Sequence, residues 1–109
     1  MNYGLHSSFV REMLKSWALR SRATTQDWNQ LTSAVLENRP LWHFKFLFKQ
    51  EARLLQQQES AKGIKVFLDQ IIGEGLYSDP QEQALYDENV LSICATAALR
   101  AWDRVQDSG

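Results

Sequence analysis

Residues 90–105 read VLSICATAALRAWDRV, and this stretch decides the fold of the chain. Its apolar side chains recur at steps of three and four residues, the spacing that places them on one face of an α-helix. These apolar positions are Val90, Leu91, Cys94, Ala97, Ala98, Ala101, Trp102 and Val105. Several of them are alanines, whose small side chains let a neighbouring helix approach closely. We therefore expect this helix at the centre of a helical bundle.

Two helices are predicted near the start of the chain. The first is expected from about Phe9 to Leu19, with an N-cap in the pair Ser7-Ser8. Thr24 and Asp27 have the spacing of a capping box and open a second helix that ends near Asn38.

The third segment fits two patterns at first. Aromatic residues at positions 42, 44, 46 and 48 alternate as in a strand, yet apolar residues at 41, 44, 48, 52 and 55 fit a helix equally well. The following stretch, Gln50–Gln58, favours a helix and contains no β-branched residue. Pro40 suits the first turn of a helix, where its missing N–H would be unsatisfied anyway. The sequence therefore predicts one long helix that ends at Lys62-Gly63.

Two short helices are expected before the last one. Val66–Ile72 forms the first and is closed by the turn Gly73-Glu74-Gly75. Asp79, an N1 proline and an N3 glutamate open the second, which runs to about Tyr86. The predicted fold class is all-α, a compact bundle of about six helices. The expected core residues are Trp28, Phe48, Leu91, Cys94, Ala98 and Trp102.

Length and composition limit the chain to a single domain. Its 109 residues are enough for one modest core, and 44% of them are apolar. No apolar run reaches the ~18 to 20 residues that span a bilayer, and no secretory signal is recognisable. The single cysteine, Cys94, reads as a small buried hydrophobe in a reducing setting such as the cytoplasm. We expect one domain over residues 1–109, with 106–109 beginning an interdomain linker.

Charge is distributed unevenly along the chain. Through Lys65 there are ten Lys or Arg against five Asp or Glu, and after it two against eight, so the first part is about +5 and the last about -6. Such a charge dipole can lie on solvated faces and have no function. It is also expected in a protein that packs head to tail with copies of itself. Cations cluster on or just beyond the first helix. The acidic second half and the lack of a recognisable nucleic-acid-binding motif nevertheless argue against specific nucleic-acid binding.

Motifs for catalysis and metal binding are missing from the sequence. There is no GxSxG, P-loop, GxGxxG, HExxH or CxxC pattern. His6 and His43 lie far apart, and neither has a second His or Cys at ligand spacing. Asp87 and Glu88 point apart on a helix and suit its positive N-terminus. The sequence predicts no enzyme, no catalytic residues, no cofactor and no metal.

Several motifs resemble, in order and spacing, the N-terminal domain of betaretroviral Gag capsid proteins. LDQIIGEGLY (68–77) is similar to the family's D-Q-L-L-G-x-G turn, QALYD (83–87) follows it, and AALRAWDRV (97–105) is similar to the final A-W-x-[KR]-[IV] helix. Tyr3–Ser7 resembles the Y-G-x-x-[SA]-P entry into the second capsid helix, and Gln26–Trp28 the P-x-D-W entry into the third. The resemblance covers nearly the whole chain and is greatest to the Gag capsid of intracisternal A-type particles.

The resemblance implies a helical capsid domain whose neighbours form the hexamers and pentamers of a shell. It places the chain in a virion or virus-like particle and in the host cytoplasm, with copies of itself and related Gag proteins as partners and without membrane insertion. In the family, the subunits of a ring meet through the second and third capsid helices, here about Phe9–Arg20 and Gln26–Glu37. The outward polar residues expected there, and hence for self-association, are Arg11, Lys15, Gln26 and Gln30.

Two departures from the family affect this expectation. The chain starts at Met1, just after the position of the family's N-terminal hairpin and first helix, and it lacks the capsid C-terminal domain. Loss of the first helix would uncover apolar surface and favour dimers. Two functions remain open, a structural capsid domain and a co-opted endogenous retroviral Gag fragment that interacts or interferes with related particles. Both functions need the same fold. A helical scaffold unrelated to Gag is the third alternative.

Overall fold

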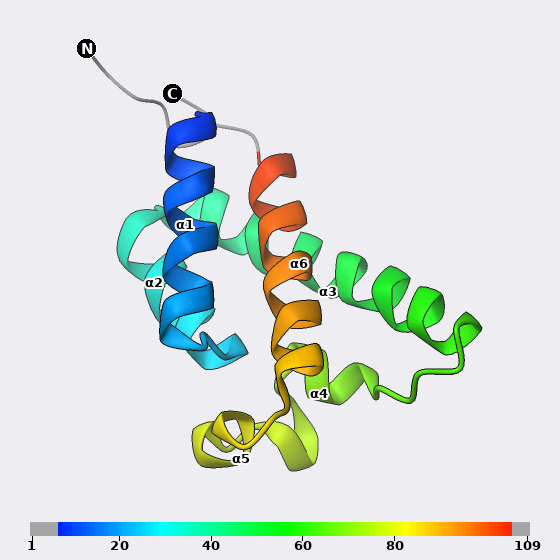
Figure 1. Cartoon of the computed structure of the whole chain (residues 1–109). Coiled ribbons are helices and arrows are strands. Elements are labelled where there is room, and N and C mark those ends of the chain that lie inside the picture. The colour runs from blue at the N-terminus through cyan, green and yellow to red at the C-terminus, as the bar shows by residue number, and fades with distance from the viewer. Residues whose placement is uncertain (1–6, 106–109) are drawn as a thin grey trace.

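The computed structural model describes residues 7–105, and every regular element in that range is a helix (Figure 1). This confirms the predicted all-α class. The expectations for Tyr3–His6 and for the linker at 106–109 lie outside the described residues. In chain order the elements are α1 (Ser8–Ser21), α2 (Thr25–Val35), α3 (Asn38–Ala61), α4 (Leu68–Ile72), the 3₁₀-helix η1 (Gly75–Tyr77), α5 (Pro80–Ala84) and α6 (Glu88–Arg104).

Side-chain caps begin α1 and α2 where the sequence predicts them, and a further cap begins α6. Ser7 caps α1 by accepting a hydrogen bond from the backbone N–H of residue 10. Thr24 and Asp27 form the predicted reciprocal capping box of α2. Asp87 caps α6, accepting from the backbone N–H of Val90 at 2.9 Å. Each cap satisfies donors that the first turn of a helix leaves unpaired.

Some helix ends differ from the prediction by two or three residues. α2 ends at Val35 instead of near Asn38, because α3 already begins at Asn38 and the chain between them is extended. α4 begins at Leu68, and the preceding Val66 is buried without being helical. α5 ends at Ala84, and an additional helix, η1, begins at Gly75, the last residue of the predicted turn after α4.

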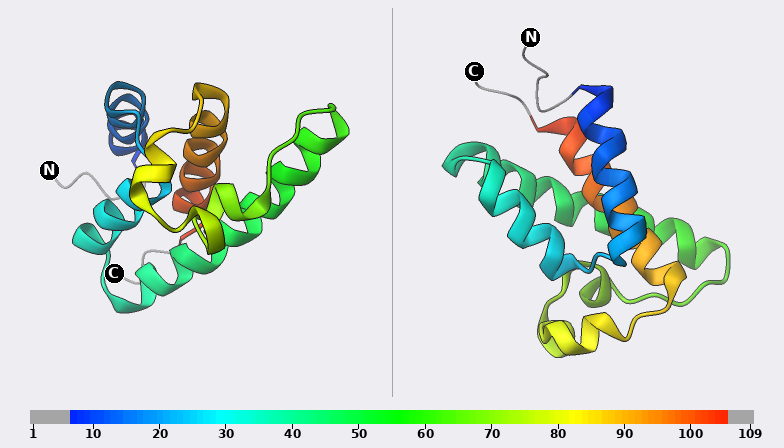
Figure 2. Two further views of the ribbon diagram at one scale, coloured as in Figure 1. Left: turned by 90° about the horizontal axis from the view of Figure 1, so that it is seen from below. Right: turned by 60° about the vertical axis from the view of Figure 1, so that its left-hand side comes forward.

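α6 lies at the centre of the bundle, as predicted. Figures 1 and 2 show it between α1 on one side and α3 on the other. All six residues expected in the core are buried. The indole of Trp28 meets that of Trp17 edge to face, with ring centroids 5.2 Å apart.

The helical period of α3 decides between the two patterns of its aromatic residues. Phe44 and Phe48 are buried and their ring centroids lie 6.0 Å apart, whereas Trp42 and Phe46 are exposed. An alternating strand would have placed all four on one face. The single long helix predicted from Pro40 onward is therefore confirmed, with Pro40 in its first turn.

A small unit of α4, η1 and α5 closes one end of the bundle and is held by a buried glutamine. The side-chain oxygen of Gln83 accepts a hydrogen bond from the backbone N–H of Gln26 at 2.9 Å. Its side-chain nitrogen donates to the carbonyl oxygen of Tyr77 at 2.8 Å. Gln83 thus joins α5 both to the start of α2 and to η1. The hydroxyl of Thr25 adds a second link by donating to the carbonyl of Ile71.

Candidate functional site

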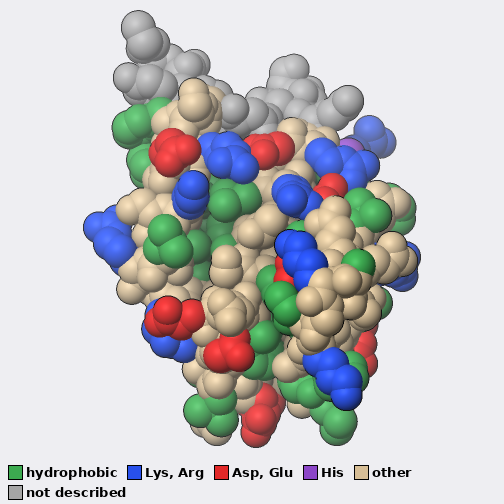
Figure 3. Space-filling model, turned by 45° about the vertical axis from the view of Figure 1, so that its right-hand side comes forward, with side chains coloured by type: hydrophobic (Ala, Val, Ile, Leu, Met, Phe, Trp, Pro, Cys, Tyr) green, Lys and Arg blue, Asp and Glu red, His purple; other side chains and the backbone are tan. Residues whose placement is uncertain are grey.

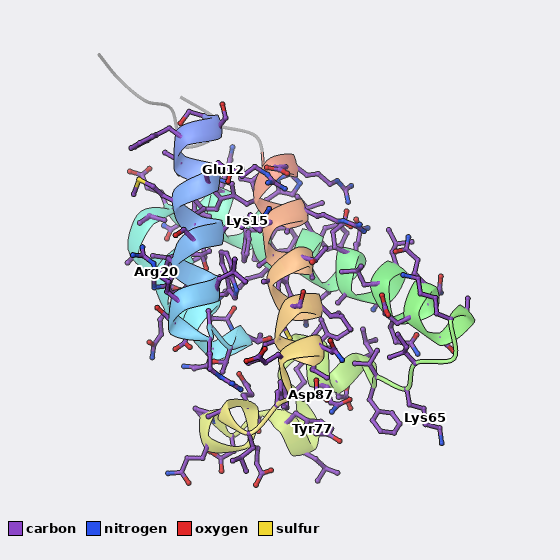
Figure 4. The ribbon with its side chains drawn as sticks, viewed as in Figure 1. Glu12, Lys15, Arg20, Lys65, Tyr77 and Asp87 are labelled. Carbon is purple, nitrogen blue, oxygen red and sulfur yellow. The ribbon has the colours of Figure 1, made fainter. Side chains whose placement is uncertain are left out.

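The outer side of α1 is the first part of the surface that the sequence indicates for self-association. Its inner side packs on the core through Leu14, Trp17 and Ala18. On the remaining sides Glu12, Lys15 and Arg20 are exposed. Figure 4 shows Lys15 directed toward the side of α6 and Arg20 projecting from another side of α1. The exposed surface of α1 therefore carries charge of both signs.

Arg11 is less outward than the sequence indicates. Its side chain is 36% exposed and pairs with Asp103 of α6, with 3.0 Å between Nε and Oδ2. Arg11 lies on the flank of α1 nearest α6, one residue along from the inward-facing Val10, and so finds a partner within its own chain. An ion pair this exposed adds less than about 1 kcal/mol to stability. It joins α1 to the last turn of α6.

The two glutamines of α2 also differ in exposure. Gln30 is exposed, whereas Gln26 is half-buried and its backbone N–H is bound to Gln83. Of the four residues predicted for self-association, Lys15 and Gln30 therefore present exposed side chains. Arg11 and Gln26 instead take part in contacts within the domain.

Exposed apolar side chains accompany this polar surface on α1. Phe9, Met13 and Leu19 each keep more than half of their surface open to solvent. Leu19 also borders an open hollow of 320 Å³ between the end of α1 and the start of α6. The hollow is lined by Ala18, Leu19, Arg22, Ala23, Glu88, Asn89, Leu91, Ser92 and Ala95. Apolar side chains beside exposed polar ones are common at surfaces that bind other proteins.

The chemistry of the buried groups is structural. Burial raises the pKa of the Cys94 thiol to about 11, and its sulfur lies 3.8 Å from the carbonyl oxygen of Ile71. Only a thiolate is a good nucleophile, so this cysteine is unreactive in the folded chain. Over residues 7–105 no group of three His, Cys, Asp or Glu side chains is placed to hold a metal ion. No helix in that range is long and apolar enough to cross a membrane.

Three contacts that position these helices carry no signal in the sequence. Gln83 is one, and a lone glutamine in a short polar helix gives no hint of burial. Glu51 is another, buried on α3, where Oε1 pairs with the Arg104 guanidinium at 2.9 Å. The third is Arg22, which donates to the carbonyl oxygen of Tyr86 at 3.1 Å. Each of the three side chains contacts a residue more than fifty positions away in the chain. Such contacts depend on how the helices pack, which local spacing does not determine.

Comparison with known proteins adds the family to this geometry. The family model described as "gag protein p24 N-terminal domain" matches residues 1–109. The chain belongs to the Gag p24 N-terminal domain family. This confirms the resemblance to retroviral capsid domains, and the p24 family is structural and not catalytic.

Curated relatives of this p24 domain come from human endogenous retroviruses. The Gag polyproteins of endogenous retrovirus group K members 5, 24 and 10 from Homo sapiens are each 26% identical to it over 110 residues. The match covers 98% of this chain but only 16% of each relative. The p24 domain therefore spans about a sixth of the length of these Gag polyproteins.

Proposed function

We propose that this p24 domain is a structural unit that associates with copies of itself to build a viral or virus-like shell. The observation that carries the proposal is the family match over residues 1–109. The fold supports it, because α1 and α2 both present exposed side chains to solvent. Its function is then protein association and not catalysis.

The proposed contact brings α1 of one copy against α2 of the next. Lys15 and Gln30 are its polar centre, because both are exposed. Leu19 supplies apolar surface beside them. A contact between two different faces repeats around a ring, so a weak interaction is multiplied. Arg11 and Gln26 contribute indirectly by holding α1 and α2 in place.

A second function is favoured by the names of the relatives. They are Gag polyproteins of endogenous retroviruses. A Gag-derived domain expressed by a host could use the same α1–α2 surface to join or interrupt particles of related Gag proteins. Both functions place the domain in the host cytoplasm and in particles assembled there. If adding this chain to a related Gag protein gave mixed particles or reduced the yield of particles, the result would favour the second function.

Disulfide cross-linking tests the α1–α2 contact. Because the only native thiol, Cys94, is buried and unreactive, any disulfide that forms must involve the introduced cysteines. A Lys15→Cys chain and a Gln30→Cys chain are mixed at high concentration and oxidised mildly. We expect the mixture to give a covalent dimer faster than either variant alone, because the contact places α1 beside α2 of another copy.

A matched pair supplies the control for random collision. Gln57→Cys on α3 and Lys65→Cys in the following loop replace side chains that are also exposed and lie outside the proposed contact. Equal cross-linking rates for the two pairs of variants would contradict the α1–α2 contact.

A further inference from the structure

The outer side of α3 carries a pair of stacked aromatic side chains. Trp42 is 72% exposed and Phe46 is 50% exposed. Their ring centroids lie 6.2 Å apart with an angle of 6° between the planes. The left view in Figure 2 shows α3 at an edge of the molecule, with α4 and α6 on its inner side. Two large rings exposed together form a patch of the kind that marks a contact with another molecule.

Positive charge flanks this aromatic pair along the same stripe of the helix. Arg39, Lys49 and Arg53 recur with the two rings at steps of three and four residues. Arg39 and Arg53 are exposed and form no ion pair within residues 7–105. We call this stripe the α3 face, which consists of Arg39, Trp42, Phe46, Lys49 and Arg53.

The carboxylates near the α3 face leave its two arginines unpaired. Glu51 is the only carboxylate between Asn38 and Gln58, and it is buried against Arg104. The ammonium of Lys49 lies 2.8 Å from Glu74. The two arginines at the ends of the stripe therefore form no ion pair with any residue of the described range 7–105.

The complementary surface lies at the end of the bundle formed by α4, η1 and α5. Residues 66–99 contain no Lys or Arg, while their carboxylates are Asp69, Glu74, Asp79, Glu82, Asp87 and Glu88. Leu76 is 89% exposed and Leu85 is 79% exposed in the same unit. Figure 3 shows red side chains between green ones at the lower end of the molecule. We call this surface the acidic end, which consists of Asp69, Leu76, Asp79, Glu82 and Leu85.

Two carboxylates of the acidic end are free to meet a cation. Asp79 already accepts the backbone N–H of Gln81 as a helix cap. Asp69 and Glu82 are exposed, and neither forms an ion pair with any described residue. The acidic end thus offers two free carboxylates and two exposed leucines. The α3 face offers two free arginines and two exposed rings.

We propose that the α3 face of one copy docks on the acidic end of a second copy. Both complementary surfaces belong to the same rigid chain, which is why a second copy is the partner. The contact joins two different faces, so it extends to a ring or an open chain of copies. The proposal rests on the proposed function only in taking a copy of this chain as partner, and it uses neither α1 nor α2.

The two kinds of side chain have different parts in this contact. Exposed ion pairs add little affinity but select the orientation and speed the encounter of the partners. Trp42 becomes buried in the proposed contact and anchors it, since tryptophan and arginine dominate the energetics of protein interfaces. Trp42→Ala should therefore raise the dissociation constant of this contact roughly tenfold or more.

A charge swap tests the proposal, with sedimentation velocity as the measurement. The background chain carries Lys15→Glu and Gln30→Glu, which remove the α1–α2 contact. One variant of it adds Arg39→Glu with Arg53→Glu, and the other adds Asp69→Lys with Glu82→Lys. We expect the background to associate, each variant alone to remain monomeric, and an equal mixture of the two to associate again. All changed side chains are exposed, and helical circular dichroism checks the fold.

Controls separate this contact from the alternatives. Arg100→Glu removes an exposed cation on α6 and should leave association of the background unchanged.

Association that is present in the wild-type chain but absent from the background would support the α1–α2 contact alone and overturn the α3 contact. So would a mixture that stays monomeric. Binding of a single-stranded oligonucleotide that is lost in Trp42→Ala, without association of copies, would assign the α3 face to nucleic acid and also overturn the proposal.

Discussion

Individual buried residues show why sequence spacing predicts the core of this domain well. Trp28, Cys94 and Trp102 are almost fully buried, and each was expected inside because it lies on the apolar stripe of its helix. A stripe depends only on local spacing, which the sequence contains. The orientation of Arg11 also depends on how α1 lies on α6, and therefore its pairing with Asp103 was not predictable from spacing.

Trp102 should make one of the largest single contributions to stability. It is among the largest fully buried side chains and lies on the central helix. Trp102→Ala should lower the free energy of unfolding by about 3 to 5 kcal/mol, because it removes a large apolar group and leaves a cavity. Urea unfolding of the two chains measures the difference. A loss below about 1 kcal/mol would mean that the side chain is not packed as described.

Cys94 should make the domain less stable in alkaline solution. Its thiol ionises near pH 9 in the unfolded chain, whereas burial raises its pKa to about 11 in the folded chain. The stabilising effect of the neutral buried thiol is therefore complete below pH 9 and is lost as the pH rises to 11, by about 2 to 3 kcal/mol. Burial also raises the pKa of Tyr86, which acts in the same direction at higher pH.

Urea unfolding at several pH values checks this expectation. Between pH 9 and 11 the wild-type chain should lose stability more steeply than Cys94→Ala, which has no thiol to ionise. Parallel pH profiles for the two chains would show that Cys94 does not titrate as a buried group.

At the scale of elements, the sequence predicts best those helix starts that carry a capping side chain. A start carries a local signal, the capping side chain, as at Ser7, Thr24 and Asp87. The start of α4 follows Phe67, which offers no capping side chain, and the end of α5 depends on how Gln83 fits against α2 and η1. The sequence therefore predicts the number and order of the α-helices but misses η1 and the exact bounds of α4 and α5.

The link from α5 to α2 should depend on Gln83. Gln83→Ala leaves the backbone N–H of Gln26 and the carbonyl of Tyr77 without their partner, at a cost of about 1 to 3 kcal/mol. Amide hydrogen exchange should also become faster at Gln26. Gln81→Ala on the same helix is the matched control, because its side chain is exposed and the substitution should change neither quantity by much. Equal stabilities of the two variants would contradict the role given to Gln83.

At the scale of the whole molecule, the charge imbalance of the sequence becomes a spatial separation. Most of the acidic residues after Lys65, from Asp69 to Glu88, lie in the unit of α4, η1 and α5 or at the start of α6, while free arginines lie on the outer side of α3. The sequence predicted a dipole and, through the family resemblance, the α1–α2 surface. It did not indicate the stacking of Trp42 and Phe46, because spacing places two residues on one side of a helix but does not determine how their rings lie.

Sedimentation equilibrium over a concentration series tests the central claim, that this domain associates with copies of itself. From about 10 µM to about 1 mM, the range expected for small exposed contacts, the average mass of the wild-type chain should rise above that of the 12.6 kDa monomer. Lys15→Glu with Gln30→Glu should weaken the rise while leaving circular dichroism and thermal stability nearly unchanged. A wild-type chain that remains a monomer at about 1 mM would contradict the account.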